Sequence, residues 1–295
     1  MAYDAVAFCP GHITGFFEVC PDEDPYKMGS RGAGICLSHG VHTGVRVADS
    51  DELRINTNLN GRAAEAPVTK KAILNLPMDK TLIEVFSRME LPVSQGFGMS
   101  GAGALSAAMA VNEALGLGLP EHKVVRAAHK AEVECMTGLG DVYPQSVGGL
   151  VVRTEPGVEP HGRIQRFTRQ GDIVLCVVGP PLPTKEVLED GAVVGRITKL
   201  GRLAMNNFLN EPSIGSFLHN SLEFAEETEL ISEEVRNAIE ACKEFGGASM
   251  SMLGNSVFAI GDTDNLRYQL LDFGETFIVS IENEGARLVS TTREE

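Results

Sequence analysis

The chain has 295 residues, of which 43% are hydrophobic and 22% charged, and its formal net charge is −15. This composition is typical of a globular protein with enough residues for two packed cores, and it excludes intrinsic disorder. So acidic a chain cannot easily assemble the basic surface that nucleic acid or an anionic membrane requires, and we exclude both as partners.

Targeting and structural-metal signals are missing from the sequence. There is no run of 18 apolar residues, and the first residues, MAYDAVAFCPGH, lack the features of a signal peptide. We therefore expect a cytoplasmic protein without a membrane span. The six cysteines are dispersed without a CxxC pair, and the histidines cluster only at His39 and His42, so we expect reduced thiols and no structural zinc.

The first half of the chain predicts strands followed by two helices. Residues 5 to 19 and 32 to 47 are predicted strands, the second with a turn near Gly40. Residues 80 to 91 alternate strictly between two faces, which is typical of a half-covered, antiparallel sheet. Further strands and helices are predicted at 53 to 59 (strand), 67 to 76 (helix), Leu105 to Leu115 (helix) and Pro120 to about Cys135 (helix).

The composition returns to strand-forming residues from about Gly148, and the Gly/Pro/His stretch at 156 to 162 is the best candidate boundary. We therefore predict an α+β protein with two domains, residues 1 to 158 and 159 to 295. The second domain is predicted to contain strands at 173 to 178, 256 to 260 and 276 to 282, and helices at 185 to 190, 194 to 208, 213 to 225 and 232 to 245.

The most informative segment is PVSQGFGMSGAGALS, residues 92 to 106. Its glycines free backbone amides ahead of a helix N-terminus, which is the arrangement of a phosphate-binding loop. A Walker loop is excluded because no Lys lies between Ser94 and Ala110. The string from Gly96 to Gly101 also fits the dinucleotide pattern GxGxxG, but a second helix follows where a Rossmann unit needs a strand. A phosphate loop of another family and a turn that binds nothing remain open.

Two carboxylates follow this loop. On the predicted helix, Glu132 shares a face with apolar Val125 and Ala128, so it is expected to be at least partly buried. Asp141 lies in the glycine-flanked TGLGDV turn, from which it can project into a cleft. With Ser100 they could hold a metal and orient a hydroxyl for phosphoryl transfer. The alternatives are a structural salt bridge for Glu132 and a plain turn at Asp141.

Three segments together resemble the motifs of the GHMP small-molecule kinases: AFCPGHITGFFE the first, PVSQGFGMSGAGAL the second and GGASMSMLGNSVFAI the third. The resemblance covers essentially the whole chain. It implies a two-domain fold, with an N-terminal ribosomal-protein-like α/β domain and a C-terminal ferredoxin-like α+β domain. Two departures are His12, where many members have Lys, and Met250, Met252 and Leu253, where the third motif usually has glycines.

The resemblance also implies roles for individual residues. Ser100 and Glu132 would ligate Mg²⁺, Asp141 would be the base or the orienting carboxylate, and His12 is a second catalytic candidate. The residues implied to bind the ATP phosphates are Ser94, Gln95, Gly96, Phe97, Gly98, Met99, Ser100, Gly101, Ala102 and Gly103.

Within the superfamily, strings such as GSRGAGICLSHGV and AHKAEVECMTGLGDV are similar to the archaeal kinases that phosphorylate the 4-hydroxyl of (R)-pantoate on the route to coenzyme A. A pantoate site needs a cation or a nest of amides for the carboxylate, together with apolar contacts. Arg31 is the candidate cation, with His12, Thr14 and Ser30 as hydroxyl partners. Arg31 as an exposed loop charge is the alternative. Kinases for homoserine, mevalonate or a sugar, and a non-catalytic metabolite sensor, are the competing functions. A homodimer is compatible with the resemblance.

Overall fold

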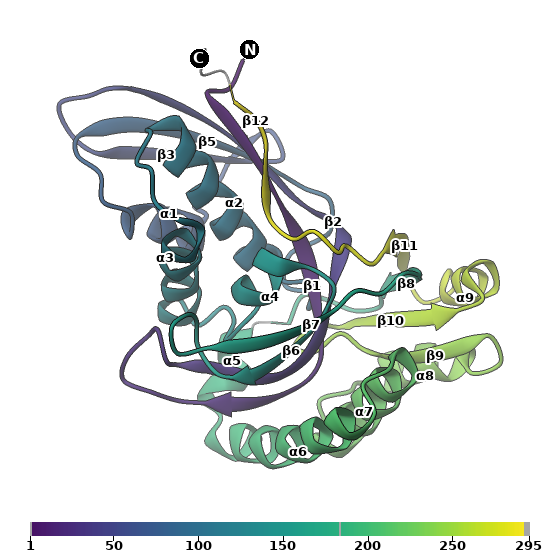
Figure 1. Cartoon of the computed structure of the whole chain (residues 1–295). Coiled ribbons are helices and arrows are strands. Elements are labelled where there is room, and N and C mark those ends of the chain that lie inside the picture. The colour runs from purple at the N-terminus through teal and green to yellow at the C-terminus, as the bar shows by residue number, and fades with distance from the viewer. Residues whose placement is uncertain (1, 183, 292–295) are drawn as a thin grey trace.

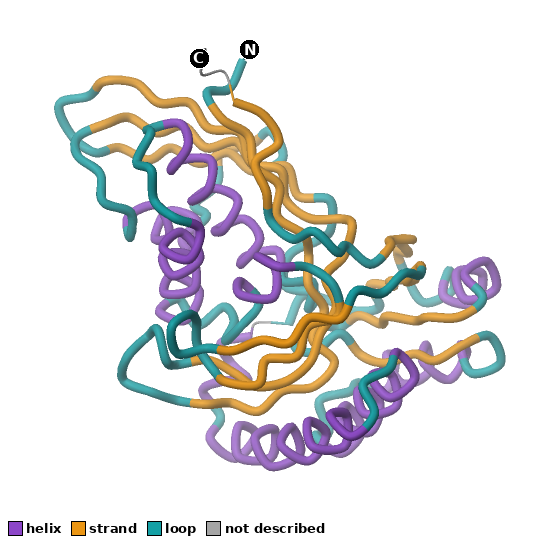
Figure 2. Tube along the Cα trace, in the orientation of Figure 1, coloured by secondary structure: helices purple, strands orange, loops and turns teal. Residues whose placement is uncertain are grey.

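The computed structural model describes residues 2–182 and 184–291, which form two β-sheets with helices packed on them (Figures 1 and 2). The strands are β1 (Ala5–Cys20), β2 (Gly29–Asp49), β3 (Arg54–Leu59), β4 (Arg62–Ala63), β5 (Thr81–Met89), β6 (Leu150–Glu155), β7 (Arg163–Phe167), β8 (Asp172–Val177), β9 (Gly246–Met250), β10 (Ser256–Gly261), β11 (Glu275–Ser280) and β12 (Arg287–Thr291). The helices are α1 (Pro67–Leu74), α2 (Met99–Ala114), α3 (Glu121–Glu134), α4 (Val142–Val147), α5 (Thr184–Glu189), α6 (Gly191–Asn210), α7 (Ile214–Glu227), α8 (Glu233–Cys242) and α9 (Thr263–Leu270).

The first sheet is built around the long strands β1 and β2. Its order is β12-β1-β2-β5-β3-β4, and β6 also pairs with β2 and carries β7 on its other edge. Strand β5 is antiparallel to β2 but parallel to β3. The predicted alternation is confirmed, since Ile83, Val85 and Ser87 are buried while Arg88 is exposed.

The turn predicted near Gly40 is wrong, because β2 continues without interruption from Gly29 to Asp49. The pairing with β1 shifts register at this point, so that Pro10 faces Gly40 whereas Gly11 faces Leu37. The glycine serves a close backbone approach, since the Cβ of any other residue would lie 2.9 Å from the carbonyl carbon of Cys9. The irregularity bends the strand pair and does not end it.

Helices α1, α2 and α3 pack together, and α2 lies against β1 and β2 (Figure 1). Eleven of the sixteen residues of α2 are buried, because its small side chains let neighbouring elements approach on several sides. Pro120 is the N-cap of α3, so this helix begins at Glu121, one residue later than predicted. The two consecutive helices therefore fix the phosphate-loop segment and Glu132 on one side of the first sheet.

The second sheet is antiparallel, with the order β11-β8-β10-β9. Helices α8 and α9 contact this sheet, α7 contacts both β9 and β1, and α6 packs along β1 (Figure 1). The phenylalanine cluster where the two units meet includes Phe16 of β1, Phe208 of α6 and Phe217 of α7. The two units therefore share a continuous hydrophobic core.

Two strands from the region assigned to the second domain belong to the first sheet. Strand β7 pairs with β6, and β12 pairs with β1. The boundary between residues 158 and 159 remains a prediction, but the chain crosses between the units more than once. In residues 2–182 and 184–291, no helix is long and apolar enough to cross a membrane.

Candidate active site

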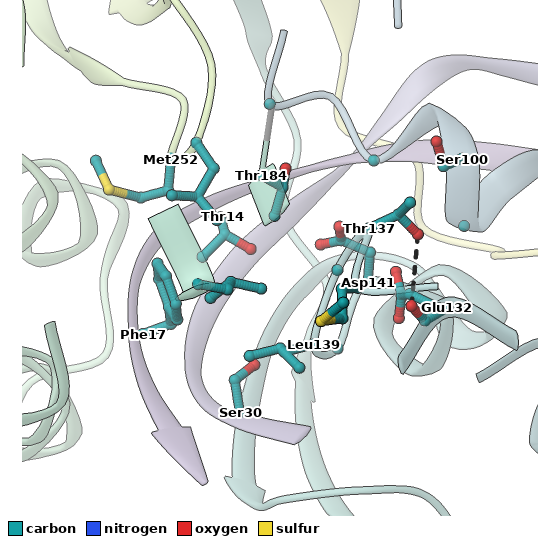
Figure 3. Close-up of a pocket in the computed structure, with 18 of the residues that line it drawn as sticks. Thr14, Phe17, Ser30, Ser100, Glu132, Thr137, Leu139, Asp141, Thr184 and Met252 are labelled. Carbon is teal, nitrogen blue, oxygen red and sulfur yellow. Dashed lines mark hydrogen bonds between the residues drawn. The ribbon is translucent and has the colours of Figure 1, made fainter. Parts of the chain in front are cut away.

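A pocket of about 340 Å³ lies where the start of α2, the end of α3, strands β1 and β6, α5 and the loop after β9 converge. Figure 3 labels ten of its residues, with Asp141 between Thr14 and Glu132 in this view. Of the residues predicted to act, Thr14, Ser30, Ser100, Glu132 and Asp141 all line this one pocket. The fold thus brings together positions from four distant parts of the sequence.

The wall formed by the start of α2 has the features of a phosphate cradle. The N-cap Gly98 has a φ of 65°, in the left-handed region that favours glycine, and no described side chain caps this helix end. The first amides of α2 have no intrahelical partner, so they are free to bind an anion at the positive end of the helix dipole. The side-chain amide of Gln145 stabilises this turn, because its Nε2 atom donates a 2.9 Å hydrogen bond to the Gly98 carbonyl.

Seven of the ten residues predicted to bind phosphate line the pocket: Ser94, Gly96, Phe97, Gly98, Met99, Ser100 and Gly101. The other three do not reach it. Ala102 is fully buried in the core, Gly103 lies deeper in α2, and Gln95 points away to donate to the Gly179 carbonyl at 3.0 Å. Gln95 therefore fastens the loop to the second unit, which the sequence pattern alone did not indicate.

Asp141, the N-cap of α4, is held by His12. His12 Nδ1 lies 2.8 Å from Asp141 Oδ1, and the imidazole is fully buried. Burial alone would raise the pKa of Asp141, but hydrogen bonds from His12 and Thr14 and the charge of Arg153 hold that pKa below its usual value. Burial lowers the pKa of His12, so its neutral imidazole donates through Nδ1. His12 does not line the pocket, which makes it a positioning residue in this geometry.

Glu132 is 1% exposed, and its Oε2 atom has no hydrogen-bond partner among the described residues. Burial and the neighbouring Asp141 charge raise the pKa of Glu132 to about 8. The expected burial is confirmed, and no described cation lies within ion-pair distance of this carboxylate. Thr137, on the turn after α3, donates to the Glu132 carbonyl at 3.5 Å (Figure 3). A buried carboxylate with a free oxygen is suited to a cation.

Arg153 was missed by the sequence analysis. Its side chain comes from β6, is 4% exposed and lines the pocket, and its Nε and Nη1 atoms have no partner within the described chain. Burial lowers the pKa of Arg153, and the charges of Asp141 and Glu132 oppose that effect. The available signal was a charged residue inside the otherwise apolar strand segment LVVR, which is costly unless an anion is bound there.

Arg31 lies outside the pocket. Its Nη1 atom is 3.2 Å from Glu18 Oε2, and its Nε atom donates to the Thr154 carbonyl at 2.8 Å. Arg202 of α6 shares the same glutamate, at 2.7 Å. The role predicted for Arg31 at the substrate carboxylate therefore has no support from this arrangement, in which its guanidinium already has an acidic partner.

Apolar side chains complete the pocket, among them Phe17, Leu139 and Met252. The loop after β9 lies directly against the phosphate loop. The approach is so close that a Cβ at Gly96 would lie 2.9 Å from the Met252 carbonyl oxygen. The Met252 amide donates to the Thr14 carbonyl at 3.1 Å. The third glycine-rich segment therefore forms part of the pocket wall.

Comparison with known proteins assigns the family. Residues 63–149 match the model of the GHMP kinases N terminal domain, and residues 189–276 match that of the GHMP kinases C terminal domain. A protein named pantoate kinase from Methanocaldococcus jannaschii is 35% identical, over 88% of this chain and 93% of the relative. Another of that name, from Methanospirillum hungatei, is 34% identical over 96% of each chain. The third, from Thermococcus kodakarensis, is 36% identical over 86% of each.

Solved structures agree. A "phosphotransferase related to CoA biosynthesis pathway" superposes with a TM-score of 0.87 at 31% identity, covering 98% of this chain and 99% of its own. A homoserine kinase from Cytophaga hutchinsonii has a TM-score of 0.70 at 15% identity, covering 98% of both chains, which shows the shared fold. The predicted α+β fold class is confirmed, and the chain belongs to the GHMP kinase family.

Proposed function

We propose that this protein transfers the γ-phosphoryl group of ATP to the 4-hydroxyl of (R)-pantoate, as a step in coenzyme A biosynthesis. The observation that carries the acceptor assignment is Arg153, a buried guanidinium with unpaired nitrogens that faces the same pocket as Asp141. A site with a fixed cation favours an acceptor that carries a carboxylate. The names of the three archaeal relatives support pantoate as that acceptor.

The acceptor would lie between Arg153 and Asp141. We assign its carboxylate to Arg153, in the place expected for Arg31, and its reacting hydroxyl to Asp141, with Thr14 and Ser30 as further polar contacts. The hydroxyl oxygen forms a bond to the γ-phosphorus while the bond from that phosphorus to the β-bridging oxygen breaks, and Asp141 accepts the hydroxyl proton. His12 keeps the carboxylate oriented through its 2.8 Å contact.

Ser94 and residues 96 to 101 would hold the ATP phosphates, chiefly through the amides at the start of α2. Ser100 and Glu132 fit a divalent ion, because Mg²⁺ is commonly bound by one or two protein oxygens together with substrate phosphates, and Glu132 Oε2 is buried without a partner. When bound, Mg²⁺ would neutralise charge that develops on the phosphate oxygens.

The apolar walls of the pocket suit pantoate, which carries two methyl groups on the carbon next to its reacting CH₂OH group. Phe17, Leu139 and Met252 offer apolar contacts for its two methyl groups. Homoserine also has a carboxylate, but it carries an ammonium group on the adjacent carbon, which Arg153 would repel, and a sugar has no carboxylate to meet the guanidinium. This charge pattern favours pantoate over those two acceptors.

A panel of acceptors tests the proposal. Purified protein with MgATP is assayed for ADP release with (R)-pantoate, homoserine, mevalonate and galactose, and the product is identified by mass spectrometry and ³¹P NMR. Pantoate is expected to be the best acceptor and to yield 4-phosphopantoate. The Asp141→Asn variant is expected to lose about 10²- to 10⁴-fold in kcat.

Two outcomes would contradict the proposal. Faster turnover of another acceptor would reassign the substrate, and near-normal kcat in Asp141→Asn would remove this residue as the base. Ligand-dependent thermal stabilisation without ADP release would instead support the non-catalytic sensor. We further propose a cytoplasmic location, and a homodimer that light scattering after size-exclusion chromatography would detect.

A further inference from the structure

The positive charge available to ATP is scarce in this pocket. Among the described residues that line it, the only cations are Arg153 and Lys185, and the acidic residues Glu132 and Asp141 lie in the same walls. Arg153 is buried on β6 and is assigned to the acceptor, and the buried neutral imidazole of His12 adds no charge. The triphosphate carries several negative charges into a protein whose net charge is −15. Lys185 is therefore the one described pocket cation without an assigned role.

The segment before Lys185 is fastened to the phosphate loop. The Leu182 amide donates to the Ser94 carbonyl at 3.1 Å, and Gln95 Nε2 donates to the Gly179 carbonyl at 3.0 Å. On the other side, Asn255 Nδ2 donates to the Pro180 carbonyl at 2.8 Å. These bonds tie the chain beside the phosphate loop three residues before Lys185, so the lysine is placed by the same residues that shape the cradle.

The side chain of Lys185 is free to move toward a ligand. It is 56% exposed, and its nearest acidic partner is Glu189 on the next turn, with 3.6 Å between Nζ and Oε1. An exposed ion pair of this kind is weak and is easily exchanged for a more highly charged anion. Its neighbour Thr184 lies at the pocket in the same view as Thr14 and Asp141 (Figure 3).

We propose that Lys185 is a further catalytic residue, which contacts the γ-phosphoryl group of bound ATP from α5 and stabilises its charge during transfer. This rests on the proposed kinase function. The flexible ammonium would approach from α5, so the transferring group would meet a mobile cation in addition to the fixed amides of α2. The interaction should strengthen in the transition state, which predicts a larger effect on kcat than on the KM of the acceptor.

Kinetics of matched variants test this role. Lys185→Gln and Lys185→Ala are expected to lower kcat about 10- to 100-fold, with the KM for pantoate within twofold of wild type, and Lys185→Arg is expected to restore part of the rate. Lys199→Ala is the control, because Lys199 is an exposed lysine of α6 outside the pocket. A kcat within twofold of wild type in Lys185→Gln would overturn the proposal.

A second measurement does not depend on the acceptor. Lysines of the wild-type protein are acetylated with N-hydroxysuccinimidyl acetate, with and without Mg²⁺ and a non-hydrolysable ATP analogue at a concentration that saturates the thermal shift, and are quantified by mass spectrometry. We expect several-fold slower labelling of Lys185 with the analogue and unchanged labelling of Lys199. Unchanged labelling of Lys185 would overturn the proposal even if the variants are slow. A wild type that leaves pantoate unphosphorylated would contradict the acceptor assignment, and nucleotide protection would then decide the role of Lys185.

Discussion

The two carboxylates of the pocket have opposite electrostatic surroundings. Asp141 accepts hydrogen bonds and lies beside a guanidinium, which favours its charged form, whereas Glu132 is buried next to Asp141, which raises the pKa of Glu132 to about 8. Groups whose pKa values are driven apart in this way commonly have different roles. In the proposed reaction, Asp141 is already ionised to accept a proton, and Glu132 becomes an effective ligand when a cation offsets its burial.

The two candidate arginines make a matched test at this scale. Losing one partner of a buried charge pair costs about 2 to 5 kcal/mol, so Arg153→Gln is expected to lower kcat/KM for pantoate by at least ~30-fold. Arg31→Gln is expected to stay within twofold, because Arg31 is already paired with Glu18 outside the pocket. Steady-state kinetics at varied pantoate concentration gives kcat/KM for each of the two variants. A larger loss in Arg31→Gln would restore the sequence-based assignment.

Local patterns in the sequence predicted the loop residues and both carboxylates, because glycine spacing and helical periodicity are encoded within a few residues. Arg153 was not predicted, because its partners come from the end of α3 and the start of α4 and meet it only in the fold. His12 was a candidate only through the family resemblance, because its contact with Asp141 spans 129 residues and leaves no local pattern. Side chains that become important through long-range contacts leave only a weak local signal.

At the scale of elements, the approach of α6 to β1 depends on one glycine. A Cβ at Gly201 would lie 2.3 Å from the carbonyl carbon of Phe17 and 2.7 Å from the Glu18 amide nitrogen. Gly195 lies on the same helix with no atom within 4 Å of its Cβ position. Backbone atoms of β1 leave no room for a Cβ at Gly201, whereas the space beside Gly195 is empty.

We therefore expect opposite effects from the same substitution on one helix. Gly201→Ala should destabilise the fold by about 1 to 3 kcal/mol, since α6 would have to move away from β1. Gly195→Ala should stabilise it by about 0.5 to 1 kcal/mol, because alanine favours the helix. Chemical denaturation of both variants measures the difference. Equal shifts would show that α6 does not depend on this close contact.

Long periodic elements were predicted well, as were short strands such as β3, β8 and β10, and the elements that were missed are also short. The helices α6 and α7 and the strand β5 lie close to their predicted bounds, whereas α4, α9, β7, β9 and β12 were missed. The missed elements have five to eight residues, too few to establish a period, and α4 contains Pro144. Their structure comes from tertiary contacts, as when β9 pairs along β10.

At the scale of the whole molecule, acid stability should depend on His129. This residue of α3 is fully buried, and its Nε2 atom donates to the Met28 carbonyl at 3.0 Å. Burial lowers the pKa of His129 to about 4. The unfolded chain binds a proton near pH 6.5, so the stability that neutral His129 provides is present above that pH and is lost as the pH falls toward 4. The loss amounts to about 3 kcal/mol at most.

His129→Gln should therefore flatten the fall in unfolding free energy between pH 6.5 and 4. His122→Gln is the matched control, because His122 is exposed on the same helix. Denaturant titrations across this pH range, in the absence of nucleotide and Mg²⁺, give the slopes. If the free energy of unfolding fell equally with pH in wild type and His129→Gln, the expected contribution of the buried imidazole would be wrong.

The pairing of β12 with β1 has a consequence for synthesis on the ribosome. Strand β1 carries His12, Thr14 and Phe17 and is made before every other described strand, yet its edge at Ala5 to Phe8 acquires its partner β12 only after all the strands and helices between them have been made. Until then, that edge is open to pairing with other nascent or misfolded chains. The strand on which catalysis depends is thus completed only when β12 has been translated.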